Sequence, residues 1–354
     1  MKGIILHGGH GTRLRPLTHT GPKQLLPIAN RPMSEYCLDA IKDAGITEVC
    51  IIIGGIGSDK VKEYYGAGEK FGVNITYIEQ DEPRGIAHAI SLCENYIENE
   101  KFLVFLGDNI IKKDISTYAK NFQQDDVDAS LLLCKVSNPT QFGIAELNDD
   151  KTIKKIIEKP KYPASNLAVT GIYFLTPKIF EIISRLKPSW RNELEITDAL
   201  QMLLSEKNKI KYYMITDYWK DTGTPEDIIF ANSEILKNMK PYFLGKKDEQ
   251  VEILGNVMIG KNTHISKGAK IMGPVIIGED CIIQAKVGPN VSIGNNCILK
   301  NCKIENSIIM NNCKIETNSK IEKSIIAPNS EIQSNLEENQ GKMLLLGEGS
   351  KLRL

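Results

Sequence analysis

The chain has 354 residues, and 44 Lys and Arg balance 44 Asp and Glu, so the formal net charge is zero. Hydrophobic residues make up 42% and charged residues 25%, which is typical of a folded globular protein long enough for two domains. A net charge of zero provides no overall attraction for phosphate backbones or anionic lipids. The composition argues against a disordered chain, and we expect neither a nucleic-acid nor a membrane partner.

The eight cysteines include no Cys-x-x-Cys pair, and most lie in apolar runs such as residues 49–51. We interpret them as reduced, packed thiols. The apolar run before His7 spans only residues 3–6, too short for a signal-peptide core, and no run approaches the ~18 apolar residues of a membrane span. We therefore expect a cytoplasmic protein.

Up to about residue 240, short apolar runs alternate with amphipathic stretches. Nearly continuous apolar runs predict buried strands at residues 4–6, 49–53, 75–78 and 102–106. Apolar residues at helical spacing predict a helix over residues 33–41, stopped by Gly45, and another over residues 85–97 in which His88 is interpreted as a packing residue. These βαβ units indicate an α/β domain with a mainly parallel sheet, in which ligands bind beyond the carboxyl ends of the strands.

After a charged linker at residues 241–250 the pattern changes. From 251 to 335 aliphatic residues recur at six-residue spacing, with two slips, which fits neither a lone helix nor a lone strand. It predicts a parallel β-helix of hexapeptide repeats. The repeating positions are Ile253, Ile259, Ile265, Ile271, Ile277 and Ile283, then Val287, Ile293 and Leu299, then Ile309, Ile315 and Ile321.

The segment 336–354 breaks this rhythm. Its apolar residues 343–346 predict a final strand that covers the open end of the solenoid, because terminal repeats need shielding. A strand used for self-association is the alternative. We expect a homo-oligomer, with the β-helix as a stacking surface and a support for the first domain.

A glycine-rich loop follows the first predicted strand. Gly8, Gly9 and Gly11 allow the backbone to approach a polyphosphate and turn its N–H groups inward, while Arg13 and Lys23 add positive charge. The loop lacks the Gly-Lys-Ser/Thr ending of a Walker A motif and the spacing of a dinucleotide fingerprint. It therefore indicates an anion-binding loop of another kind.

Residues 8–16, followed by Pro22-Lys23 and Leu26-Pro27, resemble the signature of nucleotidyltransferases that make nucleoside-diphosphate sugars. The resemblance is strongest to the long form of glucose-1-phosphate thymidylyltransferases, which carries a left-handed β-helix after a Rossmann-like domain. One departure is His7, where the family usually has a small residue. Further motifs occur in the family's order over residues 77–80 with Pro83 and Gly85, then 106–109, 142–143, 158–160, 169–171, 193–198 and 219–222.

The resemblance implies roles for individual residues. Arg13 and Lys23 would hold the triphosphate and neutralise the departing pyrophosphate, Lys159 would bind the sugar phosphate, and Asp108 and Asp221 would hold Mg²⁺. Asp108 thus belongs with Arg13, Lys23 and Lys159 among the expected catalytic residues. The expected nucleotide contacts are Leu6, Gly8, Gly9, Gly11, Thr12, Arg13, Gln80, Pro83 and Gly85, and the expected sugar-phosphate contacts are Asn109, Gly143, Glu158, Lys159 and Val169.

The implied reaction is attack of glucose 1-phosphate on the α-phosphorus of dTTP, giving dTDP-glucose and pyrophosphate for deoxysugar or polysaccharide biosynthesis. UTP is an alternative substrate, since one methyl group in an apolar pocket contributes only ~1–3 kcal/mol to discrimination. Two other functions are weighed against this reaction. A hexapeptide-repeat acyltransferase is disfavoured because His264 is the only histidine in the repeats, and a non-catalytic subunit is disfavoured because Arg13, Lys23, Asp108 and Asp221 are all present.

Overall fold

The computed structural model describes residues 1–9, 11–334 and 341–353. Its internal contacts divide the chain into two units. The first contains Met1–His10 and Met33–Asp221, and the second contains Gly11–Pro32 and Thr222–Leu354. The glycine-rich motif is therefore shared between the units, because Gly8 and Gly9 belong to the first and Gly11 to the second.

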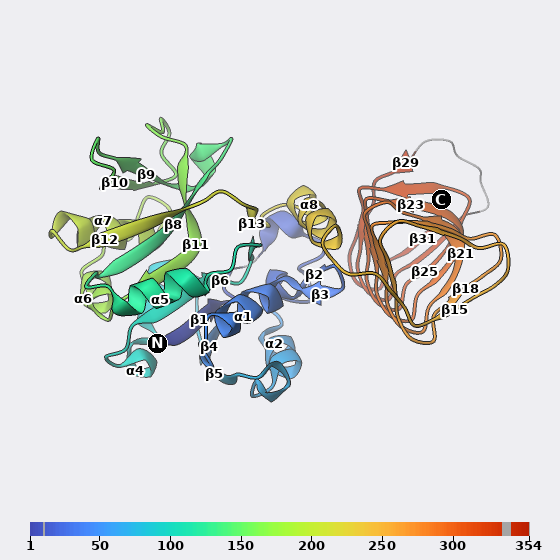
Figure 1. The fold of residues 1–354 in the computed structure, drawn as a ribbon, viewed down its shortest axis with the longest axis horizontal. Coiled ribbons are helices and arrows are strands. Elements are labelled where there is room, and N and C mark those ends of the chain that lie inside the picture. Colours follow the sequence, from blue (N-terminus) through green and yellow to red (C-terminus); the bar gives the residue numbers. More distant parts are fainter. Residues whose placement is uncertain (10, 335–340, 354) are drawn as a thin grey trace. The chain divides into compact units, whose positions relative to one another are not determined.

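Within the described residues, the first unit is built on a sheet of nine strands in the order β10-β9-β11-β6-β1-β4-β5, with β8 paired to β11 and β12 to β8 (Figure 1). Strands β6, β1, β4 and β5 are parallel, whereas β11 is antiparallel to β6. The strands are β1 (Lys2–Leu6), β4 (Glu48–Ile53), β5 (Asn74–Glu79), β6 (Phe102–Leu106), β8 (Ala129–Lys135), β9 (Gly143–Leu147), β10 (Ile153–Glu158), β11 (Leu167–Leu175) and β12 (Ile210–Ile215). The predicted strands and the mainly parallel α/β class are thus confirmed.

Helices cover both faces of this sheet because alternate strand residues point to opposite sides. Ile4 and Val104 lie in one apolar core with residues of α3, α6 and α7, while Ile41 of α1 packs against Gly3. The predicted helix over 85–97 is two helices instead, because the chain turns at Leu92 and Cys93. The helices are α1 (Met33–Asp43), α2 (Ser58–Tyr65), α3 (Ile86–Ser91), α4 (Glu94–Ile97), α5 (Ser116–Gln124), α6 (Lys178–Ser184) and α7 (Ile196–Ser205).

A two-stranded antiparallel sheet adjoins the end of β6. Its strands are β7 (Asn109–Ile111) and β13 (Trp219–Asp221), and their register pairs Asp221 with Asn109. Since Asn109 directly follows Asp108, this pairing brings two segments that are about a hundred residues apart in sequence to the carboxyl end of the parallel sheet.

The second unit begins with two 3₁₀ turns, η1 (Thr12–Leu14) and η2 (Lys23–Leu25), and the hairpin of β2 (Pro27–Ile28) and β3 (Arg31–Pro32). It continues with α8 (Pro225–Leu236), whose first turn is closed by a capping box between Thr224 and Asp227. The remaining strands are short and stack in parallel ladders.

Those ladders form three flat faces. The first follows β14-β17-β20-β22-β24-β27-β30, the second β15-β18-β21-β23-β25-β28-β31, and the third joins β16 and β19 to β21, and β26 and β29 to β23. The strands are β14 (Tyr242–Phe243), β15 (Lys246–Lys247), β16 (Glu252–Leu254), β17 (Val257–Ile259), β18 (His264–Ile265), β19 (Lys270–Met272), β20 (Val275–Ile277), β21 (Ile282–Val287), β22 (Val291–Ile293), β23 (Ile298–Glu305), β24 (Ile308–Ile309), β25 (Lys314–Thr317), β26 (Lys320–Glu322), β27 (Ile325–Ile326), β28 (Glu331–Ser334), β29 (Gly341–Lys342), β30 (Leu345–Leu346) and β31 (Lys351–Arg353).

The six-residue aliphatic period is the inner surface of this β-helix. Ile259, Ile265 and Ile277 are fully buried, as are Ile293 and Ile315, and all belong to one core. The first of the two slips in the period occurs within β21, where the ladder with β23 shifts its register between Gln284 and Lys286. The β-helix of hexapeptide repeats predicted from the sequence is thus confirmed.

Left-handed backbone conformations occur at one corner of successive coils. Asn262, Asp280, Asn296, Asn312 and Asn329 have φ between 56° and 60°. Asn and Asp tolerate this conformation better than other residues that carry a Cβ. The side chains also stack, since Asn262 donates to Asp280 at 3.0 Å and Asn312 donates to Asn329 at 3.1 Å.

The C-terminal segment contributes further ladder strands. Leu345–Leu346 forms β30, whose residues pair in parallel with Ile325 and Ile326 of β27, and β31 pairs with β28. The predicted final strand therefore continues the coils rather than crossing their end. Residues 335–340 and Leu354 of the predicted capping segment lie outside the described residues. None of the helices in the described part of the chain has the length and apolar character that a membrane span requires.

Candidate active site

The predicted site residues of the first unit follow the carboxyl ends of neighbouring strands. Leu6 ends β1 and is followed by Gly8 and Gly9, Gln80 follows β5, and Asp108 comes two residues after β6. Because these strands are parallel, their ends meet at one edge of the sheet. The fold thus gathers at this edge residues taken from the first hundred or so positions.

Gln80 lies beside the glycine-rich segment. It is only 6% exposed, and a Cβ placed on Gly8 would lie 3.3 Å from its Oε1. Its Nε2 lies 2.8 Å from Nδ1 of His88 on α3 and 3.5 Å from the carbonyl oxygen of Gly85. As an amide N–H can only donate, Nδ1 of His88 accepts, and the ring is the neutral tautomer protonated on Nε2.

The environment of His88 favours this neutral form. Burial lowers the pKa of His88, and the nearby guanidinium of Arg84 lowers it further. The sequence interpretation of His88 as a packing residue is incomplete, because its ring orients the Gln80 amide. With Nε2 turned toward His88, Oε1 of Gln80 is the acceptor on the side of Gly8, and it has no hydrogen-bond partner among the described residues.

Gly85 has a backbone conformation and surroundings that require glycine. Its φ is 106°, and a Cβ would meet the carbonyl oxygen of Leu194 at 2.4 Å. The segment around Leu194 is held there by two backbone hydrogen bonds, from Ala87 N–H to its carbonyl and from its own N–H to Arg84. Pro83, two residues before Gly85, is exposed.

Asn109 connects the two predicted metal ligands to the sheet. It is 2% exposed, and its Nδ2 donates to Oδ1 of Asp108 at 2.8 Å. Its Oδ1 accepts from Nε1 of Trp219 at 2.8 Å and from the N–H of Gly171 at 3.1 Å. This side chain fixes the orientation of Asp108 and of the strand that leads to Asp221. The expected contact between Asn109 and the sugar stays a prediction.

Tyr173 is buried, and three carboxylates influence the pKa of its phenol. Burial raises the pKa of Tyr173 on β11, and the negative charges of Glu158, Asp108 and Asp221 raise it further. Asp221 lies in β13 opposite Asn109, the residue directly after Asp108, and both carboxylates supply hard oxygen ligands. Mg²⁺ is commonly bound by one or two carboxylates together with phosphate oxygens and water, so these residues fit that ion. No cluster of three or more metal-ligating side chains occurs among the described residues.

His7 lies directly before the glycine segment and is 1% exposed. Its ring meets Tyr65 edge-on with centroids 5.9 Å apart, and neither ring nitrogen has a hydrogen-bond partner within the described ranges. Burial lowers its pKa to about 3, against an opposing effect of Asp108. His7 is therefore neutral at physiological pH and fills space under the loop rather than adding charge.

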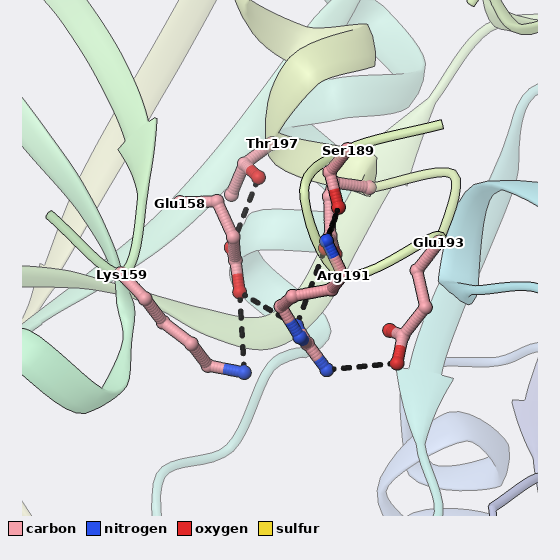
Figure 2. Close-up of polar contacts among 7 residues, drawn as sticks. Glu158, Lys159, Ser189, Arg191, Glu193 and Thr197 are labelled. Atoms are coloured by element: carbon pink, nitrogen blue, oxygen red, sulfur yellow. Dashed lines mark hydrogen bonds and ion pairs between the residues drawn. The ribbon is translucent and has the colours of Figure 1, made fainter. Parts of the chain in front are cut away.

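Glu158 is the centre of a second polar cluster at the edge of the sheet (Figure 2). It ends β10, where it pairs in register with Gly143 of β9. Its Oε2 accepts a hydrogen bond from Thr197 at 3.0 Å, and its Oε1 lies 3.4 Å from both Lys159 Nζ and Arg191 Nη1. A Cβ on Gly143 would meet Thr197 at 2.4 Å, so glycine is required for this approach.

Arg191 belongs to this polar cluster, and the sequence analysis missed it. Its Nη1 also lies 3.3 Å from Glu195, and its Nη2 lies 2.9 Å from Glu193, so one guanidinium contacts three carboxylates (Figure 2). Burial raises the pKa of Glu195 despite a hydrogen bond from Ser189. The sequence offered one clue to Arg191, which is its position two residues before the motif at 193–198.

The two cations on Glu158 differ in exposure. The side chain of Lys159 is 34% exposed and that of Arg191 is 25% exposed, whereas Glu158 is 16% exposed. Figure 2 shows both cationic groups directed at the same oxygen of the Glu158 carboxylate. Val169 lies on β11 opposite Leu133 and is 6% exposed, which makes it an apolar wall residue.

The remaining predicted phosphate contacts belong to the second unit. Gly11 has φ 56° and directly precedes η1, and its carbonyl accepts from Oγ1 of Thr18 at 2.8 Å. Thr12 and Arg13 are exposed, and the Arg13 guanidinium lies against Gly223, where an added Cβ would meet Nη1 at 3.2 Å. Lys23 in η2 is 7% exposed.

The model of the nucleotidyl transferase family matches residues 2–238, and the chain belongs to this family. Residues 256–288 match the bacterial transferase hexapeptide repeat, and residues 283–351 match the GMPPB C-terminal domain. Together with the similar proteins described next, these matches identify the chain as a sugar-1-phosphate nucleotidyltransferase with a hexapeptide-repeat β-helix.

Two curated relatives cover most of the chain. A glucose-1-phosphate thymidylyltransferase of Streptomyces antibioticus is 43% identical over 299 residues, which is 84% of this chain and 83% of the relative. The low-salt glycan biosynthesis nucleotidyltransferase Agl11 of Haloferax volcanii is 40% identical over 357 residues and covers both chains fully. A Bacillus anthracis structure assigned as a glucose-1-phosphate thymidylyltransferase in complex with a sucrose is 40% identical, with a TM-score of 0.64 over 69% of this chain and 98% of that one.

Proposed function

We propose that the protein is a Mg²⁺-dependent enzyme that transfers the thymidylyl group of dTTP to α-D-glucose 1-phosphate, giving dTDP-glucose and pyrophosphate. The observation that carries this proposal is the pairing of Asp221 with Asn109, which brings a second carboxylate beside Asp108 at the carboxyl edge of the sheet. The similarity to thymidylyltransferases supports the choice of nucleotide and sugar.

The base would be read by Gln80. Because Nε2 of Gln80 donates to His88, Oε1 is the group left to face a base over Gly8. Thymine and uracil present an N3–H donor to such an acceptor, whereas N3 of cytosine is itself an acceptor. This arrangement favours dTTP or UTP over CTP. Leu6, Pro83 and Gly85 complete the proposed base and sugar contacts, with Gly8, Gly9, Gly11 and Thr12 beside the phosphates.

The phosphates would be held by cations and by the metal. Arg13 and Lys23 bind the triphosphate and stabilise the departing pyrophosphate, and Lys159 and Arg191 bind the phosphate of the sugar. Glu158 holds these last two cations before the substrate arrives. Asp108 and Asp221 would hold the Mg²⁺, which supplies charge neutralisation between the two anionic reactants when bound.

The hexose would lie against Gly143, Val169 and Asn109, with Glu158 accepting hydrogen bonds from its hydroxyl groups. A phosphate oxygen of the sugar then attacks the α-phosphorus in line with the leaving pyrophosphate. This oxygen is already anionic at neutral pH, so no general base is needed, and catalysis consists of alignment and charge stabilisation.

We further propose that residues 1–240 form the catalytic domain, 241–250 a linker, 251–335 the β-helix and 336–354 its terminal segment. The seven buried cysteines among the eight free ones fit a reducing cytoplasm. We also propose a homo-oligomer formed through the β-helix, because its flat faces offer a stacking surface. An acyltransferase activity stays disfavoured, because His264 is the only histidine in the repeats.

A pyrophosphate-release assay tests the proposal. Purified protein with MgCl₂ is given dTTP, UTP, CTP or GTP together with glucose 1-phosphate, N-acetylglucosamine 1-phosphate or mannose 1-phosphate. We expect the highest kcat/KM with dTTP and glucose 1-phosphate, measurable turnover with UTP, and the lowest turnover with CTP and GTP. Equal turnover with CTP and dTTP would contradict the role of Gln80, and no turnover with any pair would contradict the function.

A further inference from the structure

The hairpin that follows Lys23 has a strained turn. Residues Ala29 and Asn30 connect β2 to β3 and have φ of 48° and 64°, so both adopt the left-handed conformation of a type I′ turn. Asn is well suited to this conformation, but Ala is not, because its Cβ crowds the following carbonyl. Such a residue persists only where its surroundings hold it in place.

The buried side chain of Asn232 on α8 keeps the turn in this conformation. Asn232 is fully buried, and its Oδ1 accepts two hydrogen bonds. One comes from the N–H of Ala29 at 2.8 Å, and the other comes from Oγ of Ser292 on β22 at 2.6 Å. Asn30 adds a direct bond from its Nδ2 to the carbonyl of Ile293 at 2.7 Å.

Apolar contacts surround these polar bonds. Ala29 and Leu236 form a small core with Met258 and Ile276, which lie on the outer side of the first face of the β-helix. The hairpin is therefore attached to the β-helix through Asn232 and through the direct bond of Asn30. A single residue, Leu26, separates the hairpin from η2, which carries Lys23. Lys23 is itself buried, so it has little freedom to compensate for a shift of the hairpin.

We propose that Asn232 is a positioning residue for nucleotide binding, which couples the β-helix to Lys23 through the Ala29–Asn30 turn. The inference rests on the proposed function, in which Lys23 binds the triphosphate. It assigns the β-helix a part in substrate binding in addition to any part in assembly. Removing the Asn232 acceptor leaves two buried donors unsatisfied and frees the strained turn to relax.

The primary variant is Asn232→Leu, which keeps the side-chain shape but removes the acceptor. We expect the KM for dTTP to rise five- to twentyfold and the KM for glucose 1-phosphate to stay within twofold. Amide hydrogen exchange of residues 28–31 in the ligand-free full-length protein should become at least tenfold faster. Asn232→Asp, which keeps an oxygen for both donors, should stay within threefold of wild type in the KM for dTTP.

Asn256→Leu is the matched control. Asn256 also connects α8 to the β-helix, since its Nδ2 donates to the carbonyls of Leu236 and Met239, yet it makes no bond to the hairpin in the described structure. We expect this variant to lower the melting temperature without raising the KM for dTTP. An equal rise in both variants would show a general loss of stability and would overturn the proposal. Should Asn232→Leu fail to fold, Ser292→Ala removes one of the two bonds and should raise the KM for dTTP about threefold.

A double-mutant cycle with Lys23→Met separates the possible failures. If Asn232 acts through Lys23, adding Asn232→Leu to Lys23→Met causes no further loss of kcat/KM. Fully multiplicative losses, or an unchanged KM in Asn232→Leu alone, would overturn the positioning role while leaving the proposed function standing. Wild-type kinetics in Lys23→Met would instead overturn the assignment of Lys23 and, with it, this inference.

Discussion

Nε2 of Gln80 donates a hydrogen bond to Nδ1 of His88, 2.8 Å away, and this bond determines which end of the amide faces Gly8. A glutamine that rotated freely could offer either a donor or an acceptor to a base. The imidazole removes this ambiguity as long as it stays neutral, and burial and Arg84 both lower its pKa. In the proposed function, selectivity among pyrimidine nucleotides would therefore depend on a residue that need not touch the nucleotide.

His88→Phe should weaken this selectivity. The ring keeps its approximate volume but loses the acceptor, so the Gln80 amide can present Nε2 as well as Oε1. A neutral hydrogen bond contributes about 0.5–1.5 kcal/mol, so we expect the preference for dTTP over CTP to fall by about two- to twelvefold. The ratio of kcat/KM for dTTP to that for CTP measures this preference. Gln80→Leu serves as the reference for complete loss of readout, and an unchanged preference in His88→Phe would contradict the arrangement.

Arg191 should prove necessary for use of the sugar phosphate. Arg191→Met removes a cation that contacts Glu158, Glu193 and Glu195, and it leaves those carboxylates repelling the substrate phosphate. Charge-assisted hydrogen bonds contribute about 1.5–3 kcal/mol, so kcat/KM for glucose 1-phosphate should fall about 10- to 150-fold. Arg191→Lys should recover little, because an ammonium cannot span three carboxylates.

The control for this variant is Arg185→Met. Arg185 also forms an arginine–glutamate pair, with Glu206, but that pair is largely exposed. Exposed pairs contribute little to stability, and we expect wild-type kinetics. A similar loss of activity in both variants would indicate that Arg191 acts through folding alone.

The sequence predicts well what depends on local pattern. The parallel strands, the helix over residues 33–41 and the β-helix follow from periodicity, because burial on one side of a strand or coil selects apolar residues at fixed spacing. The prediction of one continuous helix over 85–97 was wrong, because the spacing of apolar residues does not reveal the turn at Cys93 that divides it into two.

Side-chain partners were harder to predict than elements. The bond between Gln80 and His88 crosses a turn, and the contacts of Arg191 depend on how the loop before α7 meets β10. Neither pairing can be predicted from the spacing of residues, because contacts formed by tertiary structure leave no periodic pattern in the sequence. The attachment of Ala29 to Asn232, 203 residues away, is a further case.

His7 should make the protein sensitive to acid. Its pKa is about 3 in the folded state and near 6.5 when exposed, so the unfolded chain binds a proton more readily. Stability is therefore unaffected well above pH 6.5 and falls as the pH drops below it, by about 1.4 kcal/mol per pH unit down to pH 3 from this group.

Urea unfolding between pH 7.5 and 4 measures this effect. His7→Ala should be less stable than wild type at pH 7.5, because it leaves a cavity beside Tyr65, yet its stability should decline less steeply below pH 6.5. His19→Ala, which removes an exposed histidine, should keep the wild-type slope. Identical slopes in all three proteins would show that the His7 imidazole can be protonated in the folded state.

Asp108→Asn should abolish most turnover while the fold persists. The change preserves size but removes one of two carboxylates proposed to hold Mg²⁺, and by analogy with loss of one oxyanion donor we expect a drop on the order of 10²–10³ in kcat. Asp221→Asn should act similarly, and chelation with EDTA should stop the wild-type reaction until Mg²⁺ is restored. Asp149→Asn, on an exposed turn, is the control. Near-normal turnover in Asp108→Asn would contradict the assignment.

One corner of the β-helix is held by a ladder of thiols. Sγ of Cys281, Cys297 and Cys313 lies 3.1–3.2 Å from a carbonyl oxygen of the next coil, as Oγ1 of Thr263 lies 2.7 Å from the carbonyl of Gly278. Because hydroxyls occupy the same position elsewhere in the ladder, a hydroxyl should replace a thiol there. Cys297→Ser should keep the link to the carbonyl of Met310, whereas Cys297→Ala loses it.

We expect Cys297→Ala to lower the free energy of unfolding by about 1–2 kcal/mol and Cys297→Ser by about half as much, because the serine hydroxyl still donates across the coils. Cys302→Ala is the matched control, since Cys302 is also buried but its thiol donates no hydrogen bond to a carbonyl of the next coil in the described part of the chain. The difference between the two alanine variants isolates the inter-coil contact. Equal losses in both, measured by urea unfolding of the full-length protein, would show that these thiols stabilise the β-helix through packing alone.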